Sequence, residues 1–177
     1  THFPCTWVYH PDIEGDDSIY YICKKLNGES DITIVSSDTD FIQIINELDN
    51  VKLWNPVSKD YRPPTDYDYV QWKAMVGDRS DNIKGVKGIG KVKAEKILKE
   101  GILSEKLKDL NFKDAFDHSY KMIKLDDELK EFGEIKIIES CLNSEGLLSL
   151  FSAMNFKSLT GEESFEKFKQ DFSLQAN

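Results

Sequence analysis

One segment, residues 16–48, restricts the fold of this chain more than any other. The stretch "DDSIYYICKKL" has apolar residues at helical spacing and acidic residues in its first turn, which predicts a helix. "DITIVSS" follows an Asn-Gly stop, and its β-branched residues predict a buried strand. "DTDFIQIINEL" then returns to helical periodicity. A helix, a strand and a second helix in this order are typical of an α/β fold, in which sites gather at the carboxyl ends of the strands.

The rest of the chain adds an edge and a helical second half. "VKLWNPVSKDYRPP" alternates apolar and polar residues around Asn55-Pro56, which predicts an edge strand or a hairpin. Helical periodicity predicts further helices over residues 91–102, 115–132 and 145–156. The spacing of phenylalanines after Gly161 favours a short docking helix in the tail.

Charge is distributed unevenly along the 177 residues, a length that suits one domain or a core with an added subdomain. The net charge of -9 argues against non-specific binding to nucleic acid. Residues 10–50, however, hold ten Asp or Glu and two Lys, whereas residues 84–108 hold eight Lys and three Glu. This asymmetry predicts an acidic site beside a basic docking surface.

Composition also indicates the cellular compartment of the protein. No apolar run approaches the ~20 residues of a membrane span, so we expect no membrane association. The three cysteines are scattered and odd in number, which favours reduced thiols over a disulfide framework or a zinc site. A cytoplasmic protein is therefore expected.

Acidic residues recur in three short motifs, each at the end of a predicted element. "DIEGDDS" lies at a helix start, "SSDTDF" at a strand end where alternate residues share a side, and "GDRSDN" after a helix. Converging carboxylates repel one another unless a cation lies between them, and oxygen ligands favour Mg²⁺ or Mn²⁺ over zinc. Two such ions about 4 Å apart would activate water and stabilise the leaving oxygen of a phosphodiester. The alternative for each single motif is a helix N-cap or a solvated turn. The seven candidates are Glu14, Asp16, Asp17, Asp38, Asp40, Asp78 and Asp81.

A glycine-rich loop, "GVKGIG", leads from the last acidic motif into the lysine-rich segment "KVKAEKILKE". Glycines let a backbone approach a phosphate closely, and amides at a helix start attract the anion. The loop matches the hairpin of a helix-hairpin-helix element and predicts sequence-independent contact with a DNA backbone. A dinucleotide-binding loop is disfavoured because GxGxxG is absent and no strand precedes the loop. A C-cap glycine with a solvated lysine face is the simpler alternative. The candidate DNA-binding residues are Lys84, Gly85, Lys87, Gly88, Gly90, Lys91 and Lys93.

These motifs together resemble those of the 5′-nuclease family, which comprises phage 5′-3′ exonuclease/RNase H proteins, the 5′-nuclease domain of bacterial DNA polymerase I, and flap endonucleases. "IEGDDSIYYI" is similar to the family's "EADD" helix, and "IVSSDTDFIQII" to its strand ending in "DxD". "MVGDRSDNIKGVKGIGKVKAEKIL" follows the signature "GDxSDNxxGVxGIGxKxAxxLL" nearly throughout. "GLLSLFSAMNFKSL" resembles the closing helix, and the phage and bacterial branches fit better than the eukaryotic one.

The resemblance implies a role for each candidate. Glu14, Asp16, Asp17 and Asp38 would serve a first metal ion, and Asp40, Asp78 and Asp81 a second one, with Asp16, Asp38, Asp40 and Asp81 as the catalytic residues. The loop would grip duplex DNA, and the carbonyl groups of Val86 and Ile89 would hold a monovalent cation such as K⁺.

The resemblance also implies an α/β fold that is incomplete: a resolvase/PIN-like nuclease core with a helix-hairpin-helix (helix-3-turn-helix) subdomain and a helical carboxyl-terminal part. The expected domains are 1–76, a metal-binding core that lacks its first strand and arch; 77–135, the DNA-binding subdomain; and 136–177, a helical segment that packs back on the core. The chain corresponds to about the carboxyl-terminal two-thirds of the family, so we expect the missing amino-terminal segment to be a partner and cleavage by this part alone to be weak or absent.

The expected function is that of a divalent-metal-dependent, structure-specific 5′-nuclease in DNA replication or repair, in a bacterium or a phage-infected cell. It would act on 5′ flaps, overhangs or RNA primers, including RNase H-type primer removal, beside replication proteins. Two alternatives stay open: a PIN-type ribonuclease, which the glycine loop disfavours, and a DNA-binding module that has lost catalysis.

Overall fold

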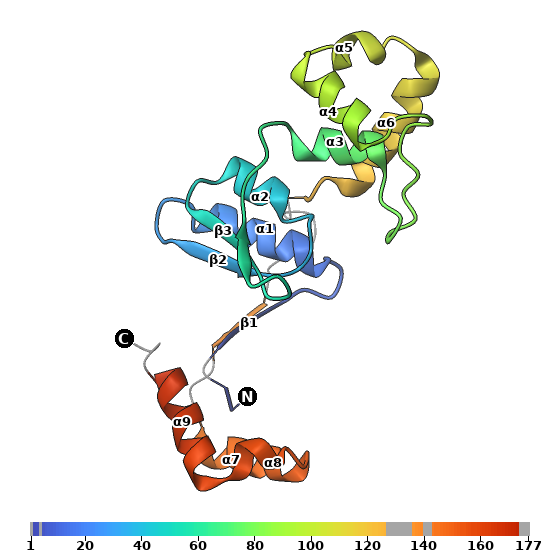
Figure 1. Ribbon diagram of the computed structural model, residues 1–177. Helices are drawn as coiled ribbons and strands as arrows, with labels where there is room; N and C mark the ends of the chain where they lie inside the picture. Colours follow the sequence, from blue (N-terminus) through green and yellow to red (C-terminus); the bar gives the residue numbers. More distant parts are fainter. Residues whose placement is uncertain (1, 4, 127–135, 140–142, 174–177) are drawn as a thin grey trace. The chain divides into compact units, whose positions relative to one another are not determined.

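The computed structural model describes residues 2–3, 5–126, 136–139 and 143–173. The chain divides into two compact units (Figure 1). The larger unit is Ile13–Phe132, and the smaller one combines Thr1–Asp12 with Gly133–Asn177. The domain boundaries expected after residues 76 and 135 remain predictions.

A three-stranded sheet forms the base of the larger unit. The strands β2 (Ile32–Val35) and β3 (Val51–Asn55) are parallel, and β4 (Asp60–Arg62) runs antiparallel to β3, in the order β2-β3-β4. Because β3 and β4 are joined by a short turn, they form the hairpin that the sequence predicts. The parallel pair requires a crossover, which the intervening helix supplies.

Two helices cover one face of this sheet, α1 (Gly15–Lys25) and α2 (Ile42–Glu47), which lie on the same side of it in Figure 1. The strands alternate accordingly: Ile34 and Leu53 are buried beneath the helices, while Val35 is 64% exposed on the opposite face. The mixed α/β fold that the sequence predicts is therefore confirmed. The buried core comprises Tyr20, Cys23, Ile34, Phe41, Ile42, Ile44, Ile45, Leu48, Val51, Leu53, Tyr69 and Leu125.

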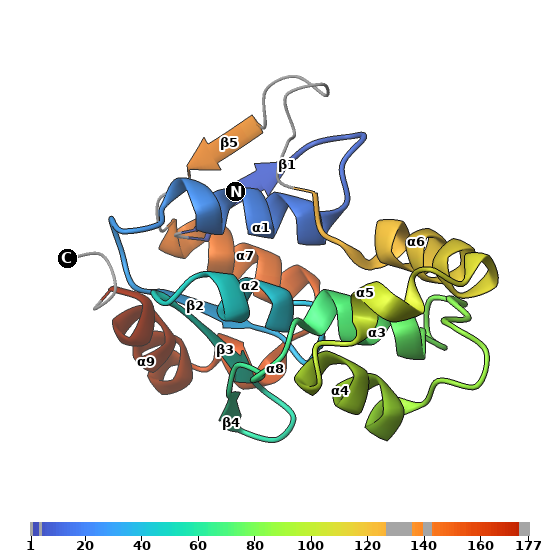
Figure 2. The same ribbon diagram turned by 90° about the horizontal axis from the view of Figure 1, so that it is seen from above.

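Four helices gather in the second half of the larger unit (Figure 2): α3 (Tyr69–Val76), α4 (Lys91–Lys99), α5 (Leu103–Lys106) and α6 (Leu110–Ile123). The helix α3 contacts both α4 and α6. It therefore lies at the centre of this group. Their shared core comprises Val70, Ala74, Met75, Val86, Ala94, Ile97, Phe116 and Ile123.

The helix α6 differs from the one predicted over residues 115–132. It begins at Leu110 because the Asp109 carboxylate caps it, accepting a hydrogen bond from the Phe112 amide at 3.1 Å. It ends at Ile123, and Lys124 is already extended with ψ 121°. Residues 127–132 of the predicted helix lie outside the described residues.

The smaller unit pairs β1 (Thr6–Tyr9) with β5 (Lys136–Glu139) in an antiparallel ladder that the sequence analysis did not predict. Its helices are α7 (Ser144–Ala153), α8 (Lys157–Thr160) and α9 (Glu162–Ser173). The predicted tail helix is confirmed by α9, whose Phe165 and Phe168 pack into a small core rich in aromatic residues. That core comprises Leu147, Phe151 and Phe165.

Within the described part of the chain, no helix combines the length and the apolar character that crossing a membrane requires.

A buried glutamine joins the end of α6 to α2. The Gln43 amide nitrogen donates to the Ile123 carbonyl at 3.3 Å, and its Oε1 accepts from the Leu125 amide at 3.0 Å. Both backbone groups lie where α6 has ended and its own ladder no longer pairs them. Gln43 therefore replaces the hydrogen bonds that the helix loses there.

We expect Gln43→Met to lower the free energy of unfolding by about 2 kcal/mol, because it leaves two buried backbone groups unpaired at constant volume. Urea titration followed by circular dichroism measures the change. The same substitution at Gln71, on α3, is the control and should alter stability by less than about 0.5 kcal/mol. Equal losses in the two variants would contradict this role of Gln43.

Candidate metal centre

A turn, and not the strand itself, presents the two carboxylates that follow β2. The strand ends at Val35, so the expected alternation of strand side chains does not extend to Asp38 and Asp40. The Asp38 amide donates to Ser36 Oγ at 3.0 Å, and the Asp40 amide donates to Asp38 Oδ1 at 2.9 Å. These bonds close an Asx-type turn, which leaves Asp38 exposed and Asp40 half-buried at the start of α2.

The loop after α3 presents the next two carboxylates. Asp78 and Ile83 exchange backbone hydrogen bonds of 2.8 and 2.6 Å, which close the loop tightly. Gly77 has φ +82° and Gly85 φ +63°, and a Cβ atom on either glycine would lie 2.5 Å from the backbone of the opposing segment. Glycine is therefore required at both positions for Asp78 and Asp81 to be presented by this turn.

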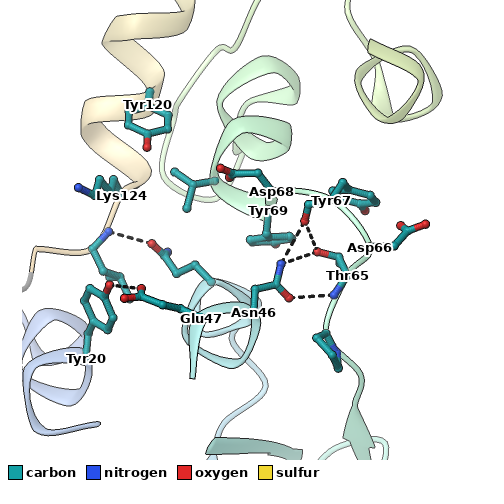
Figure 3. A pocket seen from close by; sticks show the side chains of 14 residues that line it. Tyr20, Asn46, Glu47, Thr65, Asp66, Tyr67, Asp68, Tyr69, Tyr120 and Lys124 are labelled. Atoms are coloured by element: carbon teal, nitrogen blue, oxygen red, sulfur yellow. Dashed lines mark hydrogen bonds between the residues drawn. The ribbon is translucent and has the colours of Figure 1, made fainter. Parts of the chain in front are cut away.

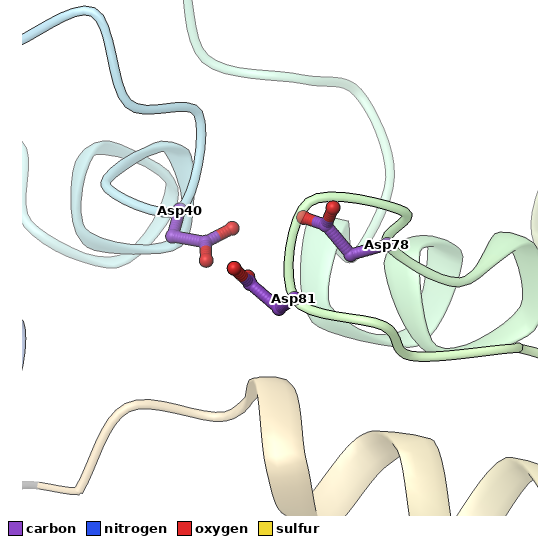
Figure 4. A group of neighbouring side chains, drawn as sticks. All are labelled: Asp40, Asp78 and Asp81. Atoms are coloured by element: carbon purple, nitrogen blue, oxygen red, sulfur yellow. The ribbon is translucent and has the colours of Figure 1, made fainter.

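The turn and the loop bring three carboxylates together (Figure 4). Asp40, Asp78 and Asp81 each offer one carboxylate oxygen, and these oxygens all lie within 4.8 Å of one another. In Figure 4 the carboxylates of Asp40 and Asp81 point toward each other across the gap between the two segments. Three negative charges at this separation repel one another, and a cation between them would remove the repulsion.

Lys73 on α3 supplies part of that positive charge. Its amine forms ion pairs with Asp40 and, at 2.5 Å, with Asp78 Oδ2, and its side chain is only 5% exposed. A buried ammonium group is costly unless it is paired, and here it is paired twice. Burial lowers the pKa of Lys73, but its hydrogen bonds to the two carboxylates outweigh this effect and raise it.

The two partners of Lys73 respond differently. The pKa of Asp40 is raised: burial is the largest cause, the charges of Asp38 and Asp78 raise it further, and together they outweigh the lowering effect of Lys73. Burial also raises the pKa of Asp78, but hydrogen bonds from Lys73 and Ser80 prevail and lower it to about 2. The two side chains are similarly exposed, at 17% for Asp40 and 15% for Asp78, so the difference follows from Ser80, whose amide and hydroxyl both donate to Asp78 Oδ1.

The remaining acidic candidates lie on and before α1. Burial raises the pKa of Asp16, and the carboxylates of Asp38 and Asp40 raise it further, so this side chain lies close to the turn after β2. Asp17 instead accepts a hydrogen bond at 2.8 Å from the Asp126 amide. Glu14 is the exposed N-cap residue of α1 and contributes to the raised pKa of Asp16.

The composition of this group suits a hard divalent cation. Its ligand atoms are carboxylate oxygens, which Mg²⁺ and Mn²⁺ prefer, and Lys73 already shows that positive charge is accommodated between Asp40 and Asp78. An entering cation would share or replace the contacts of the lysine. The residues therefore fit a metal ion, with Asp40 central to both acidic neighbourhoods.

The predicted DNA-binding residues lie on the loop between α3 and α4 and on the first turn of α4. The side chains of Lys84, Lys87, Lys91 and Lys93 are all exposed. The Val86 carbonyl accepts from the Ile89 amide at 3.1 Å, which makes the loop a tight turn. The lysine-rich surface thus directly follows Asp78 and Asp81 along the chain.

A cavity of about 680 Å³ is lined by residues other than the metal candidates (Figure 3). Tyr20, Glu47, Asp68 and Tyr69 are among its walls, and Figure 3 shows Lys124 at its edge. Lys24 Nζ already pairs with Glu47 Oε1 at 2.8 Å. Because Asp40, Asp78 and Asp81 are not among its lining residues, we locate the candidate chemistry at the carboxylates.

Lys73 is the site residue that the sequence analysis missed. It lies between Val70 and Ala74, on the side of α3 that faces the protein interior. A lysine at a buried position of an apolar helix signals a buried anionic partner, so the position of Lys73 in "YVQWKAMVG" was the available clue.

Comparison with known proteins gives the site its family context. No family model matches the chain. A 5′-3′ exonuclease of Aquifex aeolicus is 31% identical, in an alignment that covers 86% of this chain and 59% of that protein. A 5′-3′ exonuclease of Bacillus subtilis is 33% identical over 98 residues, covering 49% of this chain and 33% of that protein. The thermostable DNA polymerase I of Thermus filiformis is 36% identical over 110 residues, covering 57% of this chain and 13% of the polymerase.

The chain is thus similar in sequence to 5′-3′ exonucleases and to DNA polymerase I, in agreement with the resemblance of its motifs. The chain spans 59% of the Aquifex exonuclease and smaller shares of the other two relatives. A crystal structure of the T5 D15 protein, co-crystallised with metal ions, is similar with a TM-score of 0.54 at 19% identity, over 93% of this chain and 60% of that one. At this identity the similarity concerns the fold.

Lys73→Met should change how stability depends on pH. The lowered pKa of Asp78 stabilises the folded state above its unfolded pKa of 3.8, and this stabilisation is lost as the pH falls toward about 2. The loss in the unsubstituted chain amounts to about 2 kcal/mol. Without Lys73 this acid-dependent step should become smaller, because only the hydrogen bonds from Ser80 then lower the pKa of Asp78. Stability at pH 7 should fall by about 3 kcal/mol because the carboxylates lose their partner.

Urea unfolding at a series of pH values between 2 and 7 measures both effects. Lys113→Met is the matched control, because Lys113 pairs with Asp117 on the surface of α6 and the pair should contribute little. An unchanged acid-dependent step in Lys73→Met would show that Lys73 does not set the charge state of Asp78.

Proposed function

We propose that the chain is part of a structure-specific, divalent-metal-dependent 5′-nuclease that hydrolyses phosphodiesters in DNA replication or repair. The single observation that carries this proposal is the meeting of Asp40 with Asp78 and Asp81, from two separate motifs, with oxygens within 4.8 Å. The relatedness to 5′-3′ exonucleases and to DNA polymerase I supports the same reaction. Its substrates would be 5′ flaps, overhangs or RNA primers on DNA.

The acidic residues would hold two Mg²⁺ or Mn²⁺ ions. Asp40, Asp78 and Asp81 would bind one ion, and Asp16 and Asp38, with Glu14 and Asp17, the other. When bound, such ions supply an activated water and neutralise negative charge on the phosphodiester. Lys73 would keep Asp40 and Asp78 ionised and oriented before a metal ion arrives, because both accept hydrogen bonds from its amine. A nearby cation would stabilise the charged form of Asp16, whose pKa is raised by burial and by the neighbouring carboxylates.

The loop between α3 and α4 would grip the duplex as a helix-hairpin-helix element. Gly90 supports this role, because its φ of −101° suits any residue and a Cβ atom there would meet nothing within 4 Å. The fold thus does not require glycine at this position, whereas close approach of a DNA backbone would require it. Lys84, Lys87, Lys91 and Lys93 would neutralise phosphates, and the carbonyl groups of Val86 and Ile89 would bind K⁺.

A further strand from the rest of the protein would complete the core. The strand β2 lies at the edge of its sheet, and Val35 is 64% exposed on the face away from the helices. An edge strand that is paired in parallel and exposes an apolar side chain would be covered by a further strand that pairs with β2. The nuclease would act on DNA in the cytoplasm, beside replication proteins.

Flap cleavage tests the function directly. With Mg²⁺, the full-length protein should release the labelled strand from a 5′-flap duplex, and Asp40→Asn and Asp78→Asn should lower the rate at least about 100-fold, because each removes a metal ligand. The control is Asp114→Asn, an exposed carboxylate on α6.

Tight flap binding without release in any metal would favour the DNA-binding module, a reading to which the neutralising contacts of Lys73 lend support. A preference for single-stranded RNA would favour the PIN-type ribonuclease.

Gly90→Ala should weaken DNA binding without changing the stability of the fold. The added methyl group lies in open space in the free protein, so the free energy of unfolding should change by less than about 1 kcal/mol. The added methyl group should weaken binding of the duplex about tenfold, because it keeps the phosphate backbone away from the loop. Fluorescence anisotropy with a labelled flap duplex measures this, with Gly161→Ala in the smaller unit as control. Unchanged affinity would remove Gly90 from the DNA-binding surface.

A further inference from the structure

Neighbouring residues of α3 contact the acidic group and the lysine-rich helix. Lys73 pairs with Asp40 and Asp78, while Trp72, the residue before it, donates from its indole nitrogen to the Lys91 carbonyl at 3.3 Å. Lys91 is the first residue of α4. One short helix therefore contacts both the candidate metal ligands and the amino-terminal end of the helix that follows the DNA-binding loop.

A second polar contact holds the other end of α4. Lys99 Nζ lies 3.0 Å from Asp66 Oδ2 and 5.9 Å from the centre of the Tyr67 ring. The Tyr67 ring packs against Trp72 with 6.0 Å between ring centroids. The Tyr69 ring also stacks on Trp72, with 5.7 Å between ring centroids. We call Asp66, Tyr67, Tyr69 and Trp72 the aromatic clasp.

These two polar contacts restrict the orientation of α4 relative to α3, which apolar packing alone does not fix. Ala94 and Ile97 bury the inner face of α4 against α3, and such contacts are non-directional. Polar contacts at Lys91 and Lys99 are directional, and they lie about 12 Å apart along the helix at 1.5 Å per residue. Together they fix the tilt and the rotation of α4 relative to α3.

We propose that Trp72 is a positioning residue that sets the offset between the DNA-binding loop and the metal-binding carboxylates. The position of the cut along the substrate is then determined by the aromatic clasp. This inference rests on the proposed function and deepens it by assigning a determinant of cleavage position. The surface pair of Lys99 and Asp66 contributes orientation more than stability, because both side chains are largely exposed.

The test maps the offset without relying on hydrolysis. Fe²⁺ placed at the carboxylates of the full-length protein generates hydroxyl radicals from added peroxide, and these cut the bound DNA next to the ion. On an end-labelled flap duplex we expect a narrow cluster of cuts. Trp72→Phe, which keeps a ring but loses the indole donor, should broaden this cluster or move it by at least one nucleotide. Its affinity for the duplex should stay within about threefold of the unsubstituted protein.

Matched variants separate the possible outcomes. Trp54→Phe is the control, because Trp54 packs on Tyr61 in the hairpin of the sheet, away from the clasp. Asp66→Asn is a second variant that leaves the aromatic packing intact, and it should shift the cuts in the same way. Hydrogen exchange of residues 91–99 without metal or DNA should rise in Trp72→Phe and stay unchanged in Trp54→Phe.

A cut pattern in Trp72→Phe and Asp66→Asn that is identical to the unsubstituted one would overturn the inference while leaving the nuclease proposal intact. If the unsubstituted protein binds DNA but gives no cuts localised by Fe²⁺, the proposed metal site itself fails, and the role of Trp72 fails with it.

Discussion

The double ion pair of Lys73 is the interaction on which the geometry of the site depends. Its amine holds Asp40, from the turn after β2, and Asp78, from the loop after α3, and so joins two segments that are distant in the sequence. Without a positive charge there, burial and mutual repulsion would drive these carboxylates apart or protonate them. The lysine thus preserves in the free protein an arrangement that a divalent cation would reinforce.

The arrangement of α3 follows from this constraint. The helix presents Lys73 to the carboxylates, and Ala74 and Met75 to the core beneath α4 and α6. Its end at Gly77 starts the loop that carries Asp78 and Asp81, and that loop closes only because Gly77 and Gly85 approach each other so tightly. Asp78, Asp81 and the lysines that follow them therefore lie on one continuous segment between α3 and the first turn of α4, which explains the abrupt change from acidic to basic residues after Asp81.

Sequence reasoning identified the residue types of the site better than their supports. The acidic motifs, the strand before Asp38 and the glycine loop were all evident, because each has a local pattern that carries its meaning. Lys73 and Trp72 were not, since their partners come from other segments and only tertiary contacts show them. Strand alternation does not place Asp38 and Asp40 on one side, as the sequence predicted, because the side chains of Ser36 and Asp38 accept backbone hydrogen bonds that form a turn there. The ladder of β1 and β5 has short strands with little local signal, and it was missed for the same reason.

The central claim is that carboxylates from the two motifs form one divalent metal site. Anomalous diffraction from crystals soaked in Mn²⁺ tests it most directly. The account predicts an anomalous peak within about 2.3 Å of a carboxylate oxygen of Asp40 and of Asp78 or Asp81. A well-ordered site without such a peak, with Lys73 still bridging Asp40 and Asp78 at saturating Mn²⁺, would contradict it.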